Sequence, residues 1–336
     1  MPNHGHDIIV IAASAGGVEA LQELARGLPP DLPAAVFIVL HVPSSGPSML
    51  PRILNNSGPL RAHHAVNGEA IERGRIYIAP PDYHLLVERE RVRVVRGPRE
   101  NRARPAADPL FRSAAYAYGT RVVGVVLSGA LDDGTAGLAA IKRRGGLAVA
   151  QDPREALYSS MPRSAMENVA LDHCLPVAGI APLLAQLVSA PAKNDAVYPM
   201  SEILKVETRI ARLEESEMED VEKIGKLSAL TCPECNGALW ELRDGELLRF
   251  RCHVGHAFSA ESLIAEQSEA LENALWVALR SLEENAALSR RLAERAGKHN
   301  HTTSMTQFEK NARQVEEHAA IIRRVLHYNE KAPVDE

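Results

Sequence analysis

Short apolar runs alternate with segments of helical periodicity from Asp7 to about Ser189. An apolar run of a few residues, bounded by polar or turn residues, is typical of a buried parallel strand. The predicted strands are Ile8–Ala13, Ala34–His41, Arg75–Ala79, Val122–Ser128, Leu147–Gln151 and Val169–Leu175. The predicted helices are Val18–Leu28, Pro47–Leu54, Pro109–Tyr118, Thr135–Arg144, Pro162–Val169 and Pro182–Leu187. This alternation predicts a doubly wound α/β fold with a mostly parallel sheet.

One segment departs from the alternation of strands and helices. Residues His84–Val95 mix apolar and charged side chains in a strand-like order, which predicts a hairpin of two exposed strands. A polar loop that contains proline follows at Asn101–Pro109. We therefore expect the first domain, residues 5–192, to hold a parallel sheet and one hairpin.

The pattern changes after Ser189. Residues 190–195 are typical of a linker, and Ser201–Leu227 is predicted to be a charged helix. Leu263–Ala296 carries leucines at helical spacing, and Met305–Ile322 carries apolar residues at alternating spacings of three and four, which is typical of a coiled coil. A helical hairpin within the chain and a homodimer contact both fit this spacing. The predicted boundaries are 193–228 for linker and charged helix, 229–258 for a small cysteine-containing module, and 259–330 for the helical tail.

Composition narrows the classes of function. The chain has 336 residues, of which 46% are hydrophobic, enough for a sizeable core. Only 4% are aromatic and the net charge is −5, which argues against a nucleic-acid-binding protein. No apolar run approaches the ~20 residues of a membrane helix, and the first residues lack the apolar stretch of a signal peptide. We expect a cytoplasmic protein that is not inserted in a membrane.

Ser14 lies where the first predicted strand gives way to the first helix. The small residues Ser14–Gly17 permit a tight turn, and the N–H groups at the start of the helix point towards whatever binds there. This arrangement suits a serine nucleophile with oxyanion donors beside it. It also suits a phosphate-binding loop, although the usual glycine spacing and lysine are missing. A serine that only caps the helix is the third interpretation.

A histidine and a pair of aspartates follow two other predicted strands. His41 ends the strand Ala34–His41, and Asp132 and Asp133 come shortly after the strand Val122–Ser128. Carboxyl ends of neighbouring strands meet at one crevice in an open α/β sheet. A hydroxyl, an imidazole that takes its proton and a carboxylate that orients the imidazole form a hydrolytic triad. Ordinary capping and turn roles explain the same residues, so spacing alone leaves both interpretations open.

The motifs around these residues resemble those of a known family. They are IAASAGG at Ile11–Gly17, LHVP at Leu40–Pro43, YIAPPDYH at Tyr77–His84, LSGALDDGTAG at Leu127–Gly137, and AQD at Ala150–Asp152 with SMPR at Ser160–Arg163. In sequence and in order they are similar to the catalytic domain of CheB-type chemotaxis receptor methylesterases, over about residues 5–192. The resemblance implies a serine esterase that hydrolyses glutamate methyl esters on methylated chemoreceptor helices. Some members of the family also deamidate glutamine at those sites.

The resemblance also implies residue roles. Ser14 is then the nucleophile, His41 the general base and Asp133 the orienting carboxylate, with no cofactor for catalysis. Many members have Gly-Asn where this chain has Leu131-Asp132, and we choose Asp133 because it directly precedes the glycine. Well-known members begin with a receiver domain, whereas this sequence starts at the catalytic strand, so we expect either another form of control or a constitutively active enzyme. The helical tail is a candidate contact for chemosensory signalling proteins, and the alternative function is a non-catalytic scaffold built on the esterase fold.

The cysteines predict a metal site. Cys232 and Cys235 form a Cys-x-x-Cys knuckle, and Cys252 follows with His253 and His256 close behind. Zn²⁺ prefers such a ligand set in a closed tetrahedral site, which is structural. We favour His256 over His253 as the fourth ligand because His256 lets the chain fold back on the metal. A buried thiol cluster without metal is the alternative.

Overall fold

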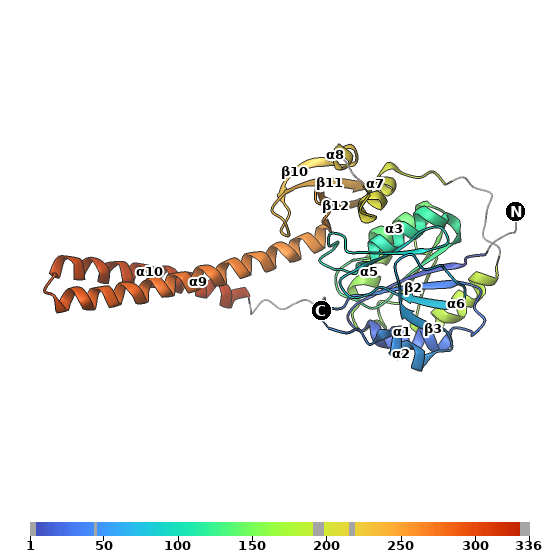
Figure 1. The fold of residues 1–336 in the computed structure, drawn as a ribbon, viewed down its shortest axis with the longest axis horizontal. Helices are drawn as coiled ribbons and strands as arrows, with labels where there is room; N and C mark the ends of the chain where they lie inside the picture. Colours follow the sequence, from blue (N-terminus) through green and yellow to red (C-terminus); the bar gives the residue numbers. More distant parts are fainter. Residues whose placement is uncertain (1–4, 44–45, 191–197, 215–218, 330–336) are drawn as a thin grey trace. The chain divides into compact units, whose positions relative to one another are not determined.

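The computed structural model describes residues 5–43, 46–190, 198–214 and 219–329 (Figure 1). The chain divides into two compact units, residues 1–263 and residues 264–336. The first unit contains a parallel α/β domain and a small antiparallel sheet, and the second contains a pair of long helices.

The centre of the first unit is a seven-stranded sheet in the order β3-β4-β2-β1-β7-β8-β9, with every neighbouring pair parallel. Its strands are β1 (Ile8–Ala13), β2 (Ala35–Leu40), β3 (Arg61–His64), β4 (Arg75–Ile78), β7 (Val122–Val126), β8 (Leu147–Gln151) and β9 (His173–Leu175). The strand order reverses at β1, which lies between β2 and β7. The predicted doubly wound fold is confirmed, and ligands of open α/β sheets bind beyond the carboxyl ends of the strands at such a reversal.

Helices cover both faces of this sheet (Figure 1). One core contains α1 (Gly17–Gly27), α2 (Leu50–Ser57) and α6 (Val177–Ser189). The other contains α3 (Ala107–Tyr118), α4 (Thr135–Arg143) and α5 (Ser160–Asn168). Successive residues of β1 alternate between the two cores, as the period of two in a strand requires. Burial on both faces explains why the central strands are continuous apolar runs.

Two features of the α/β domain differ from the expectation. The pattern does not predict β3, because this edge strand has the polar sequence Arg-Ala-His-His. The hairpin of β5 (His84–Val87) and β6 (Val92–Val95) was expected to be exposed, and that expectation is wrong: Leu85, Leu86 and Val87 are fully buried. The charged residues of this segment lie mainly in the turn between the strands, while β5 packs on α3.

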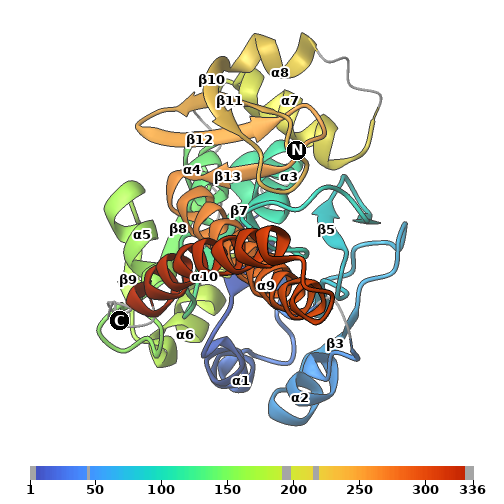
Figure 2. The ribbon, with the colours of Figure 1, turned by 90° about the vertical axis from the view of Figure 1, so that its left-hand side faces the viewer.

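A four-stranded antiparallel sheet follows the α/β domain. It consists of β10 (Lys226–Thr231), β11 (Ala238–Asp244), β12 (Leu247–Cys252) and β13 (Ala257–Ser259). Two short helices precede it, α7 (Glu202–Ala211) and α8 (Glu219–Ile224), where one charged helix over Ser201–Leu227 was expected, and β10 takes the end of that range. Residues 215–218, between the two helices, and most of the predicted linker at 190–195 lie outside the described residues. We call residues 226–263 the knuckle module. It lies on the face of the central sheet that carries α3 and α4 (Figure 2).

A buried ion-pair network joins the knuckle module to the α/β domain. Arg251, which is fully buried on β12, lies 3.0 Å from Glu100 and 2.7 Å from Glu207. Arg112 of α3 pairs with Glu100 at 2.5 Å, and Arg249 pairs with Glu207 at 2.5 Å. Removing one partner from a buried pair costs about 3–5 kcal/mol because it leaves an unpaired charge. The network therefore specifies one position for the module on α3.

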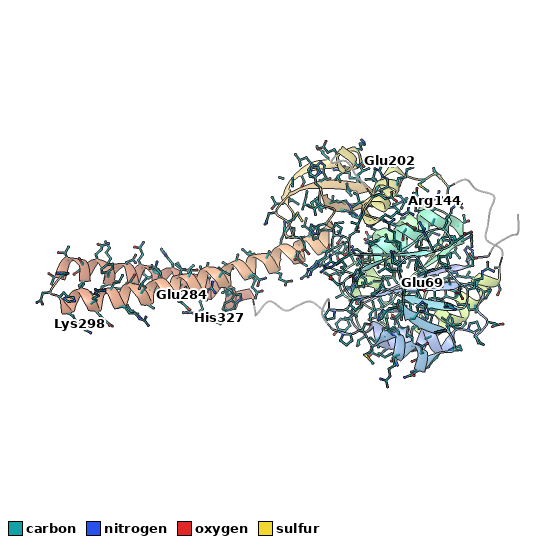
Figure 3. The ribbon with its side chains drawn as sticks, viewed as in Figure 1. Glu69, Arg144, Glu202, Glu284, Lys298 and His327 are labelled. Carbon is teal, nitrogen blue, oxygen red and sulfur yellow. The ribbon has the colours of Figure 1, made fainter. Side chains whose placement is uncertain are left out.

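The second unit is a helical hairpin formed by most of α9 (Ala260–Lys298) and by α10 (Thr302–Asn329), with Lys298 at the turn end (Figure 3). Buried residues recur every seven positions on each helix, at Leu279, Ala286 and Ala293 on α9 and at Ala312, Ala319 and Leu326 on α10. This heptad spacing is that of a coiled coil. Ion pairs of Arg290 with Glu316 and of Arg323 with Glu283 flank the seam. The two helices thus bury most of their predicted stripe against each other within one chain, although Leu271 of that stripe is exposed.

Candidate active site

Ser14 lies at the bend between β1 and α1. Its N–H donates to the Ser128 carbonyl at 2.9 Å, and its carbonyl accepts the Gly17 N–H at 2.9 Å. Gly16, at the N-cap of α1, has a φ of 67°, and a Cβ there would come within 2.8 Å of the Leu157 Cβ. No side chain caps α1, so N–H groups of its first turn are available to a developing negative charge beside Ser14.

His41 follows the neighbouring strand. Leu40, the last residue of β2, pairs with Ala13 of β1, and the His41 N–H donates to the Ala13 carbonyl at 3.1 Å. Ser14 and His41 therefore leave the sheet side by side. The His41 side chain is 19% exposed, so solvent and substrate can reach the ring. Within the part of the chain that the structure describes, no hydrogen bond joins the Ser14 hydroxyl to His41, and such contacts often tighten only when substrate binds.

Asp133 meets His41 from the other side of β1. Its Oδ2 lies 2.7 Å from His41 Nε2 and accepts the Ala107 N–H at 2.6 Å. Its Oδ1 accepts the Asn101 amide at 2.8 Å and the Asp108 N–H at 3.3 Å. Burial raises the pKa of a carboxyl group, but the hydrogen bond and charge of His41 together with these donors outweigh burial and lower the pKa of Asp133. The buried carboxylate is therefore ionised and held in one orientation.

The neighbouring aspartate is placed differently. Asp132 Oδ1 accepts the Ser259 hydroxyl at 2.7 Å. Burial raises the pKa of Asp132 to about 7, and the negative charges of Glu261 and Asp108 add to this rise. The structure thus brings Asp133, and not Asp132, against the imidazole.

Two residues that sequence reasoning missed support this arrangement. Asn101 donates to Asp133, as described above, from the polar loop after the hairpin. The Ser128 hydroxyl accepts the Tyr158 N–H at 3.0 Å and donates to the Ala15 carbonyl at 2.8 Å. These two hydrogen bonds hold the loop that carries Ser14. In the sequence, Asn101 is one polar residue of a loop and Ser128 is a polar residue at a strand end. Such residues are common, so the sequence alone does not identify these two as part of the site.

The cysteine cluster lies in the knuckle module. Cys232, Cys235, Cys252 and His256 present ligand atoms that all lie within 4.8 Å of one another. His253 is not among them and packs its ring against Trp240. All four cysteines of the chain are free of disulfides.

The geometry of these four residues fits a tetrahedral metal ion. Cys235 Sγ and Cys252 Sγ are 3.7 Å apart, and His256 Nδ1 lies 3.7 Å from Cys232 Sγ and 3.6 Å from Cys252 Sγ. Metal–sulfur bonds of about 2.3 Å give a tetrahedron with edges of about 3.8 Å. The hydrogen bonds of the Cys232 thiol and His256 lower the pKa of Cys252, and the thiolate is the form that binds metal.

Comparisons with known proteins agree with this geometry. The model of the CheB methylesterase family matches residues 9–184. A Leptospira interrogans protein assigned as a protein-glutamate methylesterase/protein-glutamine glutaminase is 39% identical over 183 residues, which are 54% of this chain and 95% of that protein. The crystal structure of the Thermotoga maritima CheB methylesterase catalytic domain covers 54% of this chain and 98% of its own, with a TM-score of 0.52 and 32% identity.

Other relatives are longer. The protein-glutamate methylesterase/protein-glutamine glutaminase 5 of Anaeromyxobacter dehalogenans is 41% identical over 184 residues, 54% of this chain but 51% of the relative. The chain thus spans about half the length of this relative in the matched region.

The chain belongs to the CheB methylesterase family. By family it is an enzyme, a protein-glutamate methylesterase, and nothing in the described residues favours the scaffold alternative. Among the described residues, no helix is long and apolar enough to cross a membrane.

Proposed function

We propose that this protein is a serine esterase that hydrolyses glutamate methyl esters on methylated chemoreceptor helices. The observation that carries the proposal is the 2.7 Å contact between His41 and the buried Asp133, beside Ser14 at the point where the strand order reverses. A hydroxyl, an imidazole and an ionised carboxylate in this order supply every group that ester hydrolysis needs, so the reaction requires no cofactor.

Each of the three residues takes one role in the proposed mechanism. Ser14 Oγ attacks the ester carbonyl while His41 takes its proton, and Asp133 stabilises the imidazolium that forms. Because Nε2 of His41 is bound to Asp133, Nδ1 is the nitrogen that accepts the proton. His41 then protonates the leaving methoxide, methanol departs, and a water activated by His41 hydrolyses the acyl-enzyme.

N–H groups at the N-terminus of α1 are the candidate oxyanion donors for both tetrahedral intermediates. They belong to the first turn of α1, which begins at Gly17 and has no side-chain cap. The Gly17 N–H itself donates to the Ser14 carbonyl, so the N–H groups that follow it are the candidates. The same acyl-enzyme forms from a glutamine side chain if ammonia leaves in place of methanol. Deamidation of receptor glutamine is therefore part of the proposed function.

The rim of the site suits a helical protein substrate. Leu157 is 72% exposed and Tyr158 is 49% exposed, and Leu157 lies directly beside Gly16. Exposed apolar side chains beside a reactive centre fit the apolar stripe of an amphipathic helix better than a small charged substrate.

The Ser14→Ala variant tests the proposal. We expect it to fold normally, because only a hydroxyl is removed, and to lose nearly all methanol release from a methylated receptor fragment. Retained activity in this variant would remove Ser14 from the mechanism.

We propose that the knuckle module binds one structural Zn²⁺ through Cys232, Cys235, Cys252 and His256. The 3.6–3.7 Å separations of the ligand atoms support a closed tetrahedral site. Four protein ligands leave no open position for substrate or water, so the metal would stabilise the module and take no part in hydrolysis. Free thiols of this kind fit a reducing, cytoplasmic compartment.

We also propose that the helical hairpin is a docking element for chemosensory proteins, for receptor helices or for a second copy of the chain. Its buried seam is satisfied within the chain, so a partner has to use the outer faces. Large apolar side chains of α9 and α10 are exposed, at Leu271, Trp276, Val277, Leu288, Ile321 and Val325. Such residues support a contact surface on these helices.

A further inference from the structure

Asn101 connects the knuckle module to Asp133. Its Nδ2 donates to Asp133 Oδ1 at 2.8 Å and to Asp108 Oδ2 at 3.0 Å. Its Oδ1 accepts the Ser259 N–H at 2.9 Å and the Ser262 hydroxyl at 3.2 Å. An asparagine side chain has two donor hydrogens and two acceptor lone pairs. All four are used, so the amide is fully satisfied.

These partners also decide which way the amide faces. A reversed amide would set its NH₂ against the Ser259 N–H, which is itself a donor, and its oxygen against two carboxylates. Both conflicts lie in a buried site, where an unpaired polar group destabilises the fold. Two of the four partners, Ser259 and Ser262, belong to the knuckle module, so the module fixes the orientation of the amide.

The knuckle module also forms a hydrogen bond with the Asn101 backbone. The Asn101 N–H donates to the Ala257 carbonyl of β13 at 2.8 Å, and the residue is 8% exposed. Its φ is 48°, in the left-handed region that asparagine tolerates better than most residues. Ser259 begins the first turn of α9, since its hydroxyl accepts the Ser262 N–H at 3.0 Å. One strand and one helical turn of the module thus meet at Asn101.

Asn101 stands between two buried carboxylates. Burial raises the pKa of Asp108 to about 6, and the charge of Asp133 adds to the rise. Arg112 lies 3.9 Å from Asp108, too far for a strong hydrogen bond. Carboxylates that share a site tend to share a proton. The hydrogen bond from Asn101 is one of the contacts that lower the pKa of Asp133, so Asn101 favours the ionised carboxylate that the imidazole needs.

We propose that Asn101 is a positioning residue for Asp133, and that the knuckle module holds it in its working orientation through Ser259 and Ser262. This inference rests on the proposed triad of Ser14, His41 and Asp133. In this arrangement the module completes the esterase site although it contributes no group to the reacting atoms.

The test is a double-mutant cycle in the full-length protein, with kcat and KM measured for methanol release from a methylated receptor fragment. Asn101→Ala is expected to lower kcat roughly 10- to 100-fold with KM unchanged, since a hydrogen bond to a charged group is lost. Ser262→Ala should lower kcat about fivefold. The double variant should be no slower than Asn101→Ala, because Ser262 acts only through Asn101. Ser268→Ala is the matched control, an exposed serine of α9 bonded to the Ile264 carbonyl, and should behave as wild type.

Each other outcome contradicts the proposal. An unchanged kcat in Asn101→Ala removes its positioning role, and independent, additive losses in the double variant remove the link to the module. If Asn101→Ala does not fold, the comparison of Ser262→Ala with Ser268→Ala decides: equal rates refute the module's part. Retained activity in Ser14→Ala would instead defeat the triad itself, whereas an inactive Ser14→Ala with a fully active Asn101→Ala defeats only this inference.

Discussion

Replacing Asp133 by asparagine isolates the charge of the carboxylate from its shape. The substitution keeps the size of the side chain but turns one oxygen into an NH₂ group. On the Oδ1 side that NH₂ would face two donors, the Asn101 amide and the Asp108 N–H. On the Oδ2 side it would face one donor, the Ala107 N–H, and would donate to His41. Each donor–donor conflict costs about 1–3 kcal/mol, so the NH₂ is expected on the Oδ2 side.

That placement forces the wrong tautomer of His41. If Nε2 accepts a hydrogen bond, the ring proton of the neutral imidazole sits on Nδ1, which then cannot take the proton of Ser14. The same exchange in a serine protease lowers the rate by about 10⁴, or ~5.5 kcal/mol of barrier. We expect a loss of this order in kcat for Asp133→Asn, measured as methanol release from a methylated receptor fragment.

Asp132→Asn is the matched control, because an asparagine oxygen at position 132 can still accept the Ser259 hydroxyl. We expect this variant to stay within about tenfold of wild type, a loss of at most ~1.4 kcal/mol. The reasoning is refuted if Asp133→Asn keeps a rate near wild type, or if the larger loss follows Asp132.

Three further predictions concern metal, pH and the hairpin. Purified protein should contain about one zinc per chain, and metal analysis that finds none without chelator would remove the site. The folded pKa of Asp132 is raised to about 7, so the contribution of Asp132 to stability should fall as the pH rises from about 4 to about 7. Asp132→Asn should therefore raise the melting temperature more at pH 8 than at pH 4, and an equal gain would contradict this. Removal of residues 275–336 should spare hydrolysis of a small ester and weaken that of a receptor fragment; unchanged rates on both would exclude docking, and a rise would indicate an inhibitory tail.

Much of the α/β domain could be predicted because its strands are buried on both faces. The apolar run Ile8–Ala13 and the small residues after it predict β1, the bend and α1, and thus the place of Ser14. β3 could not be predicted, since an edge strand needs little apolar surface. The strands of the hairpin were predicted to be exposed because the segment contains many charged residues. The sequence pattern does not show that most of these residues lie in the turn.

The parts of the site that could not be predicted depend on contacts between distant residues. Asn101 and Ser262 are 161 positions apart. Arg251 and Glu100 are charged, and charged residues are almost always assigned to the surface, yet both are buried as a pair. Only the fold shows that these residues meet.

The contacts between the knuckle module and Asn101 also link the metal site to catalysis. The triad and the cysteines lie far apart in the sequence, which suggests that hydrolysis depends little on the metal. In the structure, His256 is followed directly by β13, whose Ala257 carbonyl and Ser259 N–H hold Asn101. A metal that ties His256 to Cys232 would fix the start of β13, and metal binding in such small modules is folding free energy. A structural metal site can therefore support turnover without taking part in the reaction. It would hold β13 in place, and β13 holds Asn101 beside Asp133.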